Sequence, residues 1–179
     1  MTTSVSKLMI EAGQKARAAS RRMAAASTAD KNKALLRLAE LLEAKKEDIF
    51  AANEQDLVKA KENRLKESFV DRLRVTEKVL RLMAEGARQT AALPDPVGEI
   101  SEMRRRPSGI QVGRMRVPLG VLGIIYESRP NVTVDAACLA VKSGNACILR
   151  GGSEAFETNR ILGELVQQAL TETGLPTEA

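Results

Sequence analysis

The amino-acid sequence contains no histidine and only two cysteines, Cys138 and Cys147. Without histidine, the chain offers neither Ser–His nor Cys–His catalysis and no histidine-bound metal, and we expect no metal site. Two cysteines do not make a disulfide framework, so a reducing cytoplasm is the expected compartment. Cys138 falls in an apolar helix pattern and Cys147 in a buried strand pattern, so both are interpreted as packing residues rather than nucleophiles.

Aromatic residues are also scarce, with one Tyr, three Phe and no Trp in 179 residues. Proteins that bind single-stranded nucleic acids stack bases on aromatic side chains, so this composition argues against that class. Much of the net charge of +5 comes from residues 15–22 and 104–106, which are explained by solvated surfaces. No apolar run reaches membrane-spanning length, and no signal-peptide pattern is present. We therefore expect neither a nucleic acid nor a membrane as a partner.

Roughly the first ninety residues show the apolar periodicity of amphipathic helices. Ser27 and Asp30 have the spacing of a capping box at a helix start. The apolar face that follows consists of Leu35, Leu38, Ala39, Leu42 and Ile49. Residues 53–57 are interpreted as a break or a new cap, before a shorter helix that ends near Asn63.

A further helix is expected over residues 75–92. Its inward-facing residues are predicted to be Val79, Leu82, Met83 and Ala87. The sequence Leu-Pro-Asp-Pro at residues 93–96 ends the helical part, because proline cannot continue a helix.

A β-hairpin is predicted next, with residues 99–106 and 110–117 on either side of a Pro-Ser-Gly turn. We expect the hairpin to lie outside the main layers of the fold. Because a protruding hairpin exposes strand edges unless a partner covers them, an oligomer contact is a reasonable hypothesis for it.

Residues 118–179 show a strand–helix–strand–helix pattern, with strands at 121–125 and 146–149 and helices at 132–142 and 155–173. Gly144 and Gly174 are expected to end the two helices. The predicted fold class is α/β: N-terminal helices (1–97), a hairpin arm (98–117) and the first βαβ unit of a Rossmann-like parallel sheet (118–179). Two parallel strands are too few for a covered sheet, so we expect an incomplete domain.

The first candidate site is the loop after the second strand, formed by Arg150, Gly151, Gly152, Ser153 and Glu154. Glycines permit close approach of a ligand, a helix N-terminus favours anions, and an arginine suits phosphate. The loop therefore fits a phosphate or a ribose hydroxyl. The alternative is structural: a tight strand-to-helix turn in which Ser153 caps the next helix.

The second candidate site is the turn after the first strand, which runs Tyr-Glu-Ser-Arg-Pro-Asn at residues 126–131. Arg129 could hold a carboxylate or an acyl phosphate, and Asn131 could donate to a developing oxyanion. The alternative is structural: Asn131 caps the following helix and Arg129 pairs with Glu127.

Both turns belong to the longer segment MRVPLGVLGIIYESRPNVTVDAACLAVKSGNACILRGGSE, which resembles the γ-glutamyl phosphate reductases, also called glutamate-5-semialdehyde dehydrogenases. They are a family of the aldehyde dehydrogenase superfamily. The resemblance extends upstream through AANEQDLVKAKENRLKESFVDRL and LPDPVGEI, so it covers nearly the whole chain. YESRPNVT and ILRGGSE are specific to this family, whereas PLGVLGII is shared across the superfamily.

The resemblance implies an NADP cofactor and the reduction of L-glutamyl 5-phosphate by NADPH, which yields glutamate 5-semialdehyde and phosphate in proline biosynthesis. It implies that Arg150, Ser153 and Glu154 meet the adenosine ribose and that Asn131 stabilises an oxyanion. Arg129 is assigned to an anionic part of the substrate. A homo-oligomer and an association with glutamate kinase are also implied.

Family members are longer, and their nucleophilic cysteine follows a glycine-rich segment to which nothing in this sequence corresponds. We therefore expect the catalytic domain to be absent from this chain and the chain alone to be inactive. The alternative hypothesis is a non-catalytic nucleotide-binding module.

Overall fold

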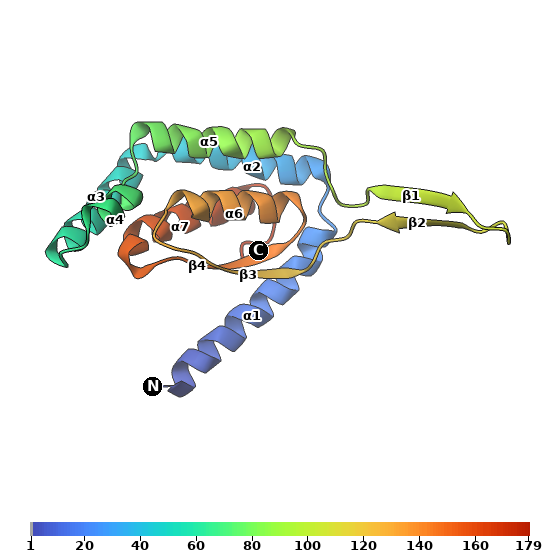
Figure 1. The fold of residues 1–179 in the computed structure, drawn as a ribbon, viewed down its shortest axis with the longest axis horizontal. Helices are drawn as coiled ribbons and strands as arrows, with labels where there is room; N and C mark the ends of the chain where they lie inside the picture. The colour runs from blue at the N-terminus through green and yellow to red at the C-terminus, as the bar shows by residue number, and fades with distance from the viewer. Residues whose placement is uncertain (1) are drawn as a thin grey trace.

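The computed structural model describes residues 2–179, and its elements form layers that Figure 1 shows from the side. Helices α2 and α5 form one outer layer, α6 and α7 lie beneath them, and the strands β3 and β4 follow. The long helix α1 crosses the opposite face of these strands. The helices are α1 (Thr2–Ala24), α2 (Thr28–Ala44), α3 (Lys46–Glu62), α4 (Glu67–Leu73), α5 (Glu77–Ala92), α6 (Asn131–Lys142) and α7 (Phe156–Glu172), and the strands are β1 (Ile100–Arg105), β2 (Gln111–Met115), β3 (Val121–Ile125) and β4 (Ala146–Arg150).

The main hydrophobic core lies between the α2–α5 layer and the α6–α7 layer. Leu35 and Leu42 of α2 pack there with Met83 of α5 and Leu162 of α7, all with 2% exposure or less. The apolar face predicted for residues 35–49 is buried throughout. The core is built from aliphatic side chains because the sequence supplies almost no aromatic ones.

The helix breaks of the N-terminal half differ in part from the prediction. Ser27 caps α2 as expected, since its hydroxyl accepts a hydrogen bond of 3.1 Å from the backbone N–H of Asp30. The break that follows lies at Lys45, however, and residues 53–57 lie inside α3. The predicted break at residues 53–57 was wrong because the Asn53 side chain does not cap its own helix. It bonds Leu73 O and Val75 N of another segment instead.

Helix α5 begins two residues later than predicted, with Thr76 as its cap. Met83 and Ala87 are buried, but the inward position predicted for Leu82 was wrong, because this side chain is 60% exposed. The face that packs on α2 and α6 carries Leu80, Met83, Ala84 and Ala87. The short helix α4 was not predicted from the sequence.

The strand–helix–strand unit matches the prediction closely. Strands β3 and β4 pair in parallel, from Val121 opposite Ala146 to Ile125 opposite Arg150, and α6 connects them. Gly144 adopts a φ of 70° after the end of α6, as a left-handed helix terminus requires. The last helix is preceded by a 3₁₀ turn at Ser153–Ala155, so α7 itself begins at Phe156.

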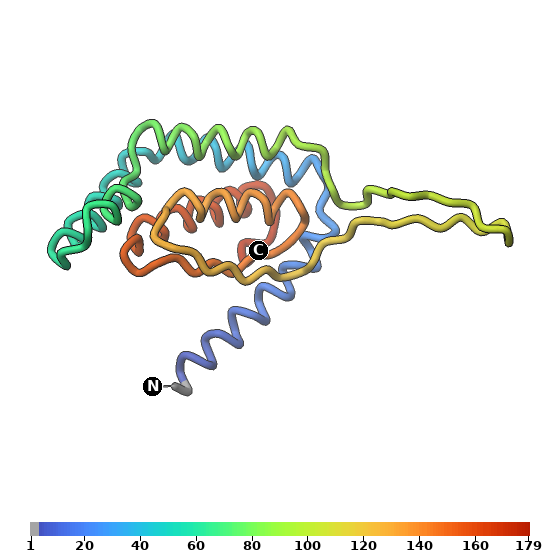
Figure 2. The backbone as a smooth tube through the Cα atoms, viewed as in Figure 1, coloured from blue at the N-terminus to red at the C-terminus, as the bar shows by residue number. Residues whose placement is uncertain are grey.

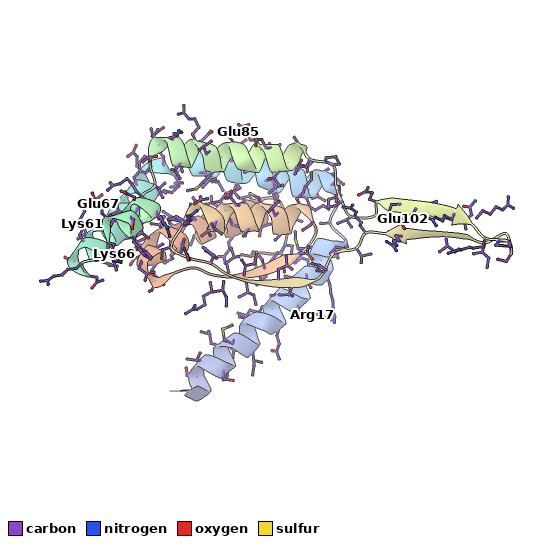
Figure 3. All side chains as sticks on the ribbon, viewed as in Figure 1. Arg17, Lys61, Lys66, Glu67, Glu85 and Glu102 are labelled. Atoms are coloured by element: carbon purple, nitrogen blue, oxygen red, sulfur yellow. The ribbon has the colours of Figure 1, made fainter. Side chains whose placement is uncertain are left out.

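The predicted hairpin is present and extends away from the layers, as the backbone trace in Figure 2 shows. Every residue of β1 and β2 is exposed, and the side chains of this arm, Glu102 among them, project into solvent in Figure 3. The pairing is interrupted between Ser101 and Arg104, where Glu102 has a φ of 55°. An isolated two-stranded hairpin is only marginally stable in water.

A buried ion pair fixes the base of the arm. The Lys31 ammonium lies 2.5 Å from the Asp95 carboxylate, which also accepts hydrogen bonds from the Thr28 hydroxyl and from Val97 N. Burial opposes the charged form of Asp95, but these bonds, led by that of Lys31, hold its pKa below the ordinary value. Lys142 is buried in the same region, with its ammonium bonded to Asn32 Oδ1 and Ala91 O.

Within residues 2–179, no helix is long and apolar enough to cross a membrane. Over the same residues, the acidic and cysteine side chains form no group that could hold a metal ion.

Deletion of residues 101–115 is expected to leave a folded monomer. Arg116 N bonds Glu99 O and Gly98 N bonds Arg116 O, so the two ends of the deletion lie together. Sedimentation velocity and circular dichroism of both proteins test this expectation. An unchanged oligomer in the variant, or a wild-type protein that is already a monomer, would count against the arm as an oligomer contact.

The substitution Asp95→Asn is expected to lower the free energy of unfolding by about 3 kcal/mol at neutral pH, because it leaves the buried Lys31 ammonium unpaired. The folded-state pKa of Asp95 is lowered, so its contribution is present above its ordinary pKa of about 3.9 and is lost as the pH falls through the lower folded value. Urea unfolding as a function of pH measures both effects.

The matched control is Arg88→Gln, which breaks the exposed pair of Arg88 with Glu43 and should leave the urea midpoint unchanged. The double variant Lys31→Met/Asp95→Asn should recover part of the lost stability. Equal urea midpoints for Asp95→Asn and the wild type would refute the role of this ion pair.

Candidate functional site

The two predicted site turns begin side by side at one edge of the sheet. The parallel register brings Ile125 opposite Arg150, and Tyr126 N donates a further hydrogen bond of 3.1 Å to Arg150 O. The carboxyl ends of parallel strands are where α/β folds bind ligands. The turn at residues 126–131 and the loop at residues 150–154 therefore form the candidate site.

A hydrogen bond between side chains joins the turn to the loop. The hydroxyl of Ser128, which is 7% exposed, donates to Glu154 Oε2 at 2.6 Å. This bond is the main reason that the pKa of Glu154 lies below its ordinary value, so the carboxylate is ionised at neutral pH. The sequence indicated neither Ser128 nor its bond to Glu154 as a link between the two turns.

The close packing of the loop against the turn and α7 leaves no room for a side chain at Gly151 or Gly152. A Cβ atom on Gly152 would overlap Ser128 Oγ and would lie 3.2 Å from the backbone N of Ser128. A Cβ atom on Gly151 would overlap the Asn159 amide and would lie 3.1 Å from the Tyr126 ring. Packing of loop against turn is thus sufficient to explain why both residues are glycine.

A chain of hydrogen bonds holds the turn onto α6 and α7. The Tyr126 hydroxyl lies 2.6 Å from Thr133 Oγ1, and the Thr133 hydroxyl donates to Asn159 Oδ1 at 2.9 Å. Because the Thr133 hydroxyl donates its proton to Asn159, its oxygen accepts the hydrogen bond from the Tyr126 hydroxyl. Burial raises the pKa of Tyr126, which keeps its phenol protonated as this arrangement requires.

The start of α7, directly after the loop, is capped from a distant helix. The buried carboxylate of Asp56 on α3 accepts hydrogen bonds from Glu157 N at 3.1 Å and from Thr158 N at 2.8 Å. Ser153 makes no cap hydrogen bond, so its predicted role as the helix cap was wrong. This helix start was expected from the sequence to favour an anionic ligand, but the N–H groups of Glu157 and Thr158 already bond the Asp56 carboxylate of α3.

The remaining predicted site residues lie on the surface of this region. Arg150, Ser153 and Arg129 are exposed, and Asn131 is half-buried at the first turn of α6. Asn131 does not cap α6 and donates instead to Asp135 Oδ2 at 3.2 Å.

The alternative pairing of Arg129 with Glu127 is also not formed. Glu127 pairs with Arg72 of α4 at 3.5 Å, and the link between residues 127 and 129 is a backbone hydrogen bond. The Arg129 guanidinium has no ion-pair partner within residues 2–179. It is therefore available to an anionic ligand.

Neither cysteine has the surroundings of a nucleophile. Burial, with a smaller contribution from Asp135, raises the pKa of Cys138 to about 12. Burial also raises the pKa of the half-buried Cys147. Because the thiolate is the reactive form, these surroundings disfavour either side chain as a nucleophile.

Residues 2–179 match the model of the aldehyde dehydrogenase family, and the chain belongs to that family. The structure is similar to the γ-glutamyl phosphate reductase of Thermotoga maritima, with a TM-score of 0.90 and 43% identity over 94% of this chain. It is also similar to the γ-glutamyl phosphate reductase of Saccharomyces cerevisiae, with a TM-score of 0.88 and 33% identity. The chain spans 41% of the first protein and 44% of the second.

A more distant similarity is found to a NAD-dependent benzaldehyde dehydrogenase of Corynebacterium glutamicum, with a TM-score of 0.67 and 25% identity. It covers 88% of this chain and 32% of that protein. These findings confirm the resemblance inferred from the sequence and the expected fold class, an incomplete aldehyde dehydrogenase-like α/β fold. The family implies a nicotinamide cofactor.

The substitution Gly152→Ala is expected to destabilise the protein by about 2 kcal/mol, because the new methyl group must force the loop away from Ser128. Thermal or urea unfolding measures the loss. The matched control is Gly163→Ala in α7, where no atom lies within 4 Å of the added Cβ and the higher helix propensity of alanine should stabilise. Equal effects of the two substitutions would show that the loop contact does not require glycine.

Proposed function

We propose that this chain forms the cofactor-binding part of a γ-glutamyl phosphate reductase, which reduces L-glutamyl 5-phosphate with NADPH to glutamate 5-semialdehyde and releases phosphate. The observation that carries the proposal is the pair of adjoining turns at the sheet edge, in a chain 43% identical to the Thermotoga maritima enzyme. The reaction belongs to proline biosynthesis. NADPH supplies the hydride when it is bound.

The residues of the loop fit the adenosine end of NADPH. The Arg150 side chain is exposed and has no ion pair within the described part of the chain, so its guanidinium can bind a phosphate with two donors. Ser153 is exposed and is not used as a helix cap, and its hydroxyl, which lies beside the Glu154 carboxylate, is placed to meet a ribose or phosphate oxygen. These two side chains support the 2′-phosphate of NADPH over the hydroxyl of NADH.

The turn at residues 126–131 is proposed to face the reacting end. Arg129 would bind a negatively charged group of glutamyl phosphate, because its guanidinium is exposed and unpaired within residues 2–179. Asn131 would donate its amide to the oxygen that becomes negative during reduction. It would then exchange its present bond to Asp135 for the substrate oxygen.

The second candidate function is a non-catalytic nucleotide-binding module. Within this chain, burial raises the pKa of Cys138 and of Cys147, which disfavours the thiolate that reduction in this family requires. Under the leading proposal, assembly into a homo-oligomer and an association with glutamate kinase are also expected, since an acyl phosphate hydrolyses when released into water.

Arg150→Gln is expected to weaken NADPH binding about tenfold or more, because a charge-assisted contact to phosphate is worth roughly 1.5–3 kcal/mol. NADH lacks the 2′-phosphate, so its affinity should change much less. Tryptophan is absent from the sequence, so fluorescence of the bound nicotinamide or calorimetry is the suitable measurement. The control is Arg160→Gln on α7, whose guanidinium already pairs with Glu157 and Glu164.

NADP⁺-dependent oxidation of glutamate 5-semialdehyde in phosphate buffer, the reverse reaction, tests the expectation that the chain alone is inactive. Saturable NADPH binding without turnover is expected under both candidate functions. Turnover that Arg150→Gln reduces would contradict the expected inactivity. Failure of the wild-type protein to bind either nucleotide would refute both.

A further inference from the structure

The start of α7 is a place where an α/β fold would ordinarily hold a ligand phosphate, because the first-turn N–H groups are free donors and carry partial positive charge. Here two of these groups, on Glu157 and Thr158, are bonded to the Asp56 carboxylate. The same carboxylate accepts the Thr158 hydroxyl at 2.7 Å. Asp56 is 1% exposed, so the carboxylate is a built-in anion beneath the loop.

We propose that Asp56 is a positioning residue for the cofactor loop. Its carboxylate occupies the anion position of α7, so that the loop must recognise the nucleotide through the side chains of Arg150 and Ser153. The proposal rests on the proposed function for the identity of the ligand. The occupation of the helix start is independent of that function.

The negative charge of Asp56 is stabilised by the start of α7 and not by a basic side chain. Within residues 2–179 the carboxylate forms no salt bridge, and its partners are two backbone N–H groups and one hydroxyl. A buried carboxylate without a cation is costly unless hydrogen bonds and a dipole stabilise it. The positive end of α7 supplies both, so carboxylate and helix start depend on each other.

Asn53, one turn earlier on α3, orients the third partner. Its side-chain N–H donates to Leu73 O at 2.7 Å and to Thr158 Oγ1 at 3.2 Å. Thr158 therefore accepts from Asn53 and directs its own proton to Asp56. Lys59 adds an exposed ion pair from α3 to Glu157 at 3.0 Å. One face of α3 thus fixes the start of α7, where the loop ends.

A second anion cannot share this position. A phosphate that approached the N–H groups of Glu157 and Thr158 would meet a carboxylate of like charge that has already taken their hydrogen bonds. The 3₁₀ turn at Ser153–Ala155, which begins with Ser153 itself, lies between these amides and Arg150. The ligand phosphate is accordingly directed to the exposed side chains at the other end of the loop.

The test removes the carboxylate and then replaces it. In Asp56→Ala, the lost cap is expected to lower the melting temperature, and NADPH affinity is expected to fall about tenfold because the loop is no longer held at the start of α7. Sodium formate should restore both the melting temperature and the NADPH affinity of this variant, because formate can occupy the vacated anion position. Sodium chloride at equal ionic strength should restore neither.

Asn53→Ala is the matched control. It disrupts the same buried cluster but leaves the carboxylate on the α7 amides, so it should lose stability without recovering in formate. Equal responses of the two variants to formate would overturn the proposal. If Asp56→Ala does not fold, Asp56→Asn is compared with Asn53→Ala by melting temperature and NADPH affinity without formate, with a smaller loss expected because its carbonyl oxygen still accepts one N–H bond.

The wild-type protein supplies a measurement without substitutions. In ¹⁵N-labelled protein, addition of NADPH should shift the amide signals of Ser153 and Glu154 and leave those of Glu157 and Thr158 in place. A large shift of the last two would overturn the proposal. Absence of NADPH binding, combined with recovery of Asp56→Ala in formate, would refute the proposed function while supporting occupation of α7 by Asp56.

Discussion

The parallel pairing of β3 with β4 is the constraint on which the candidate site depends. Parallel strands cannot be joined by a short turn, so the chain must cross over through α6, and both strands then end at the same edge. Two segments that are distant in sequence thereby come into contact. The bond from Ser128 to Glu154 forms at this edge, and the absence of a side chain at Gly152 permits it.

The helical half of the chain contributes more than core packing, because its buried polar side chains bond segments outside their own helices. Asp56 and Asn53 on α3 hold the start of α7 and the connection before α5, and Lys31 on α2 holds Asp95 at the base of the arm. Buried charges of this kind add little net stability compared with apolar replacements. Their effect is to specify where the loop and the arm lie relative to the layers.

Local patterns were enough to predict the strands, the arm and the α6 terminus, because alternation, turn residues and glycine act over a few neighbours. The predictions for residues 53–57, Leu82 and Ser153 were wrong because partners far along the chain decided those positions. In the sequence, a polar residue such as Asn53 suggests a helix cap, but the sequence does not tell whether it bonds its own helix or a distant segment. The roles of Arg129, Asn131 and Arg150 stay predictions, since residue type indicates a chemical capacity and does not identify its ligand.

The glycines of the Gly-Gly-Ser sequence have a structural explanation that does not involve a nucleotide. Contact with Ser128, Tyr126 and Asn159 already accounts for both glycines, so their presence adds no support for a phosphate. The α7 amides add none either, because Asp56 holds them. The support for a nucleotide therefore rests on fewer groups: the Arg150 guanidinium, which forms no ion pair within residues 2–179, and the exposed Ser153 hydroxyl. Both lie at the carboxyl edge of a sheet in an aldehyde dehydrogenase fold.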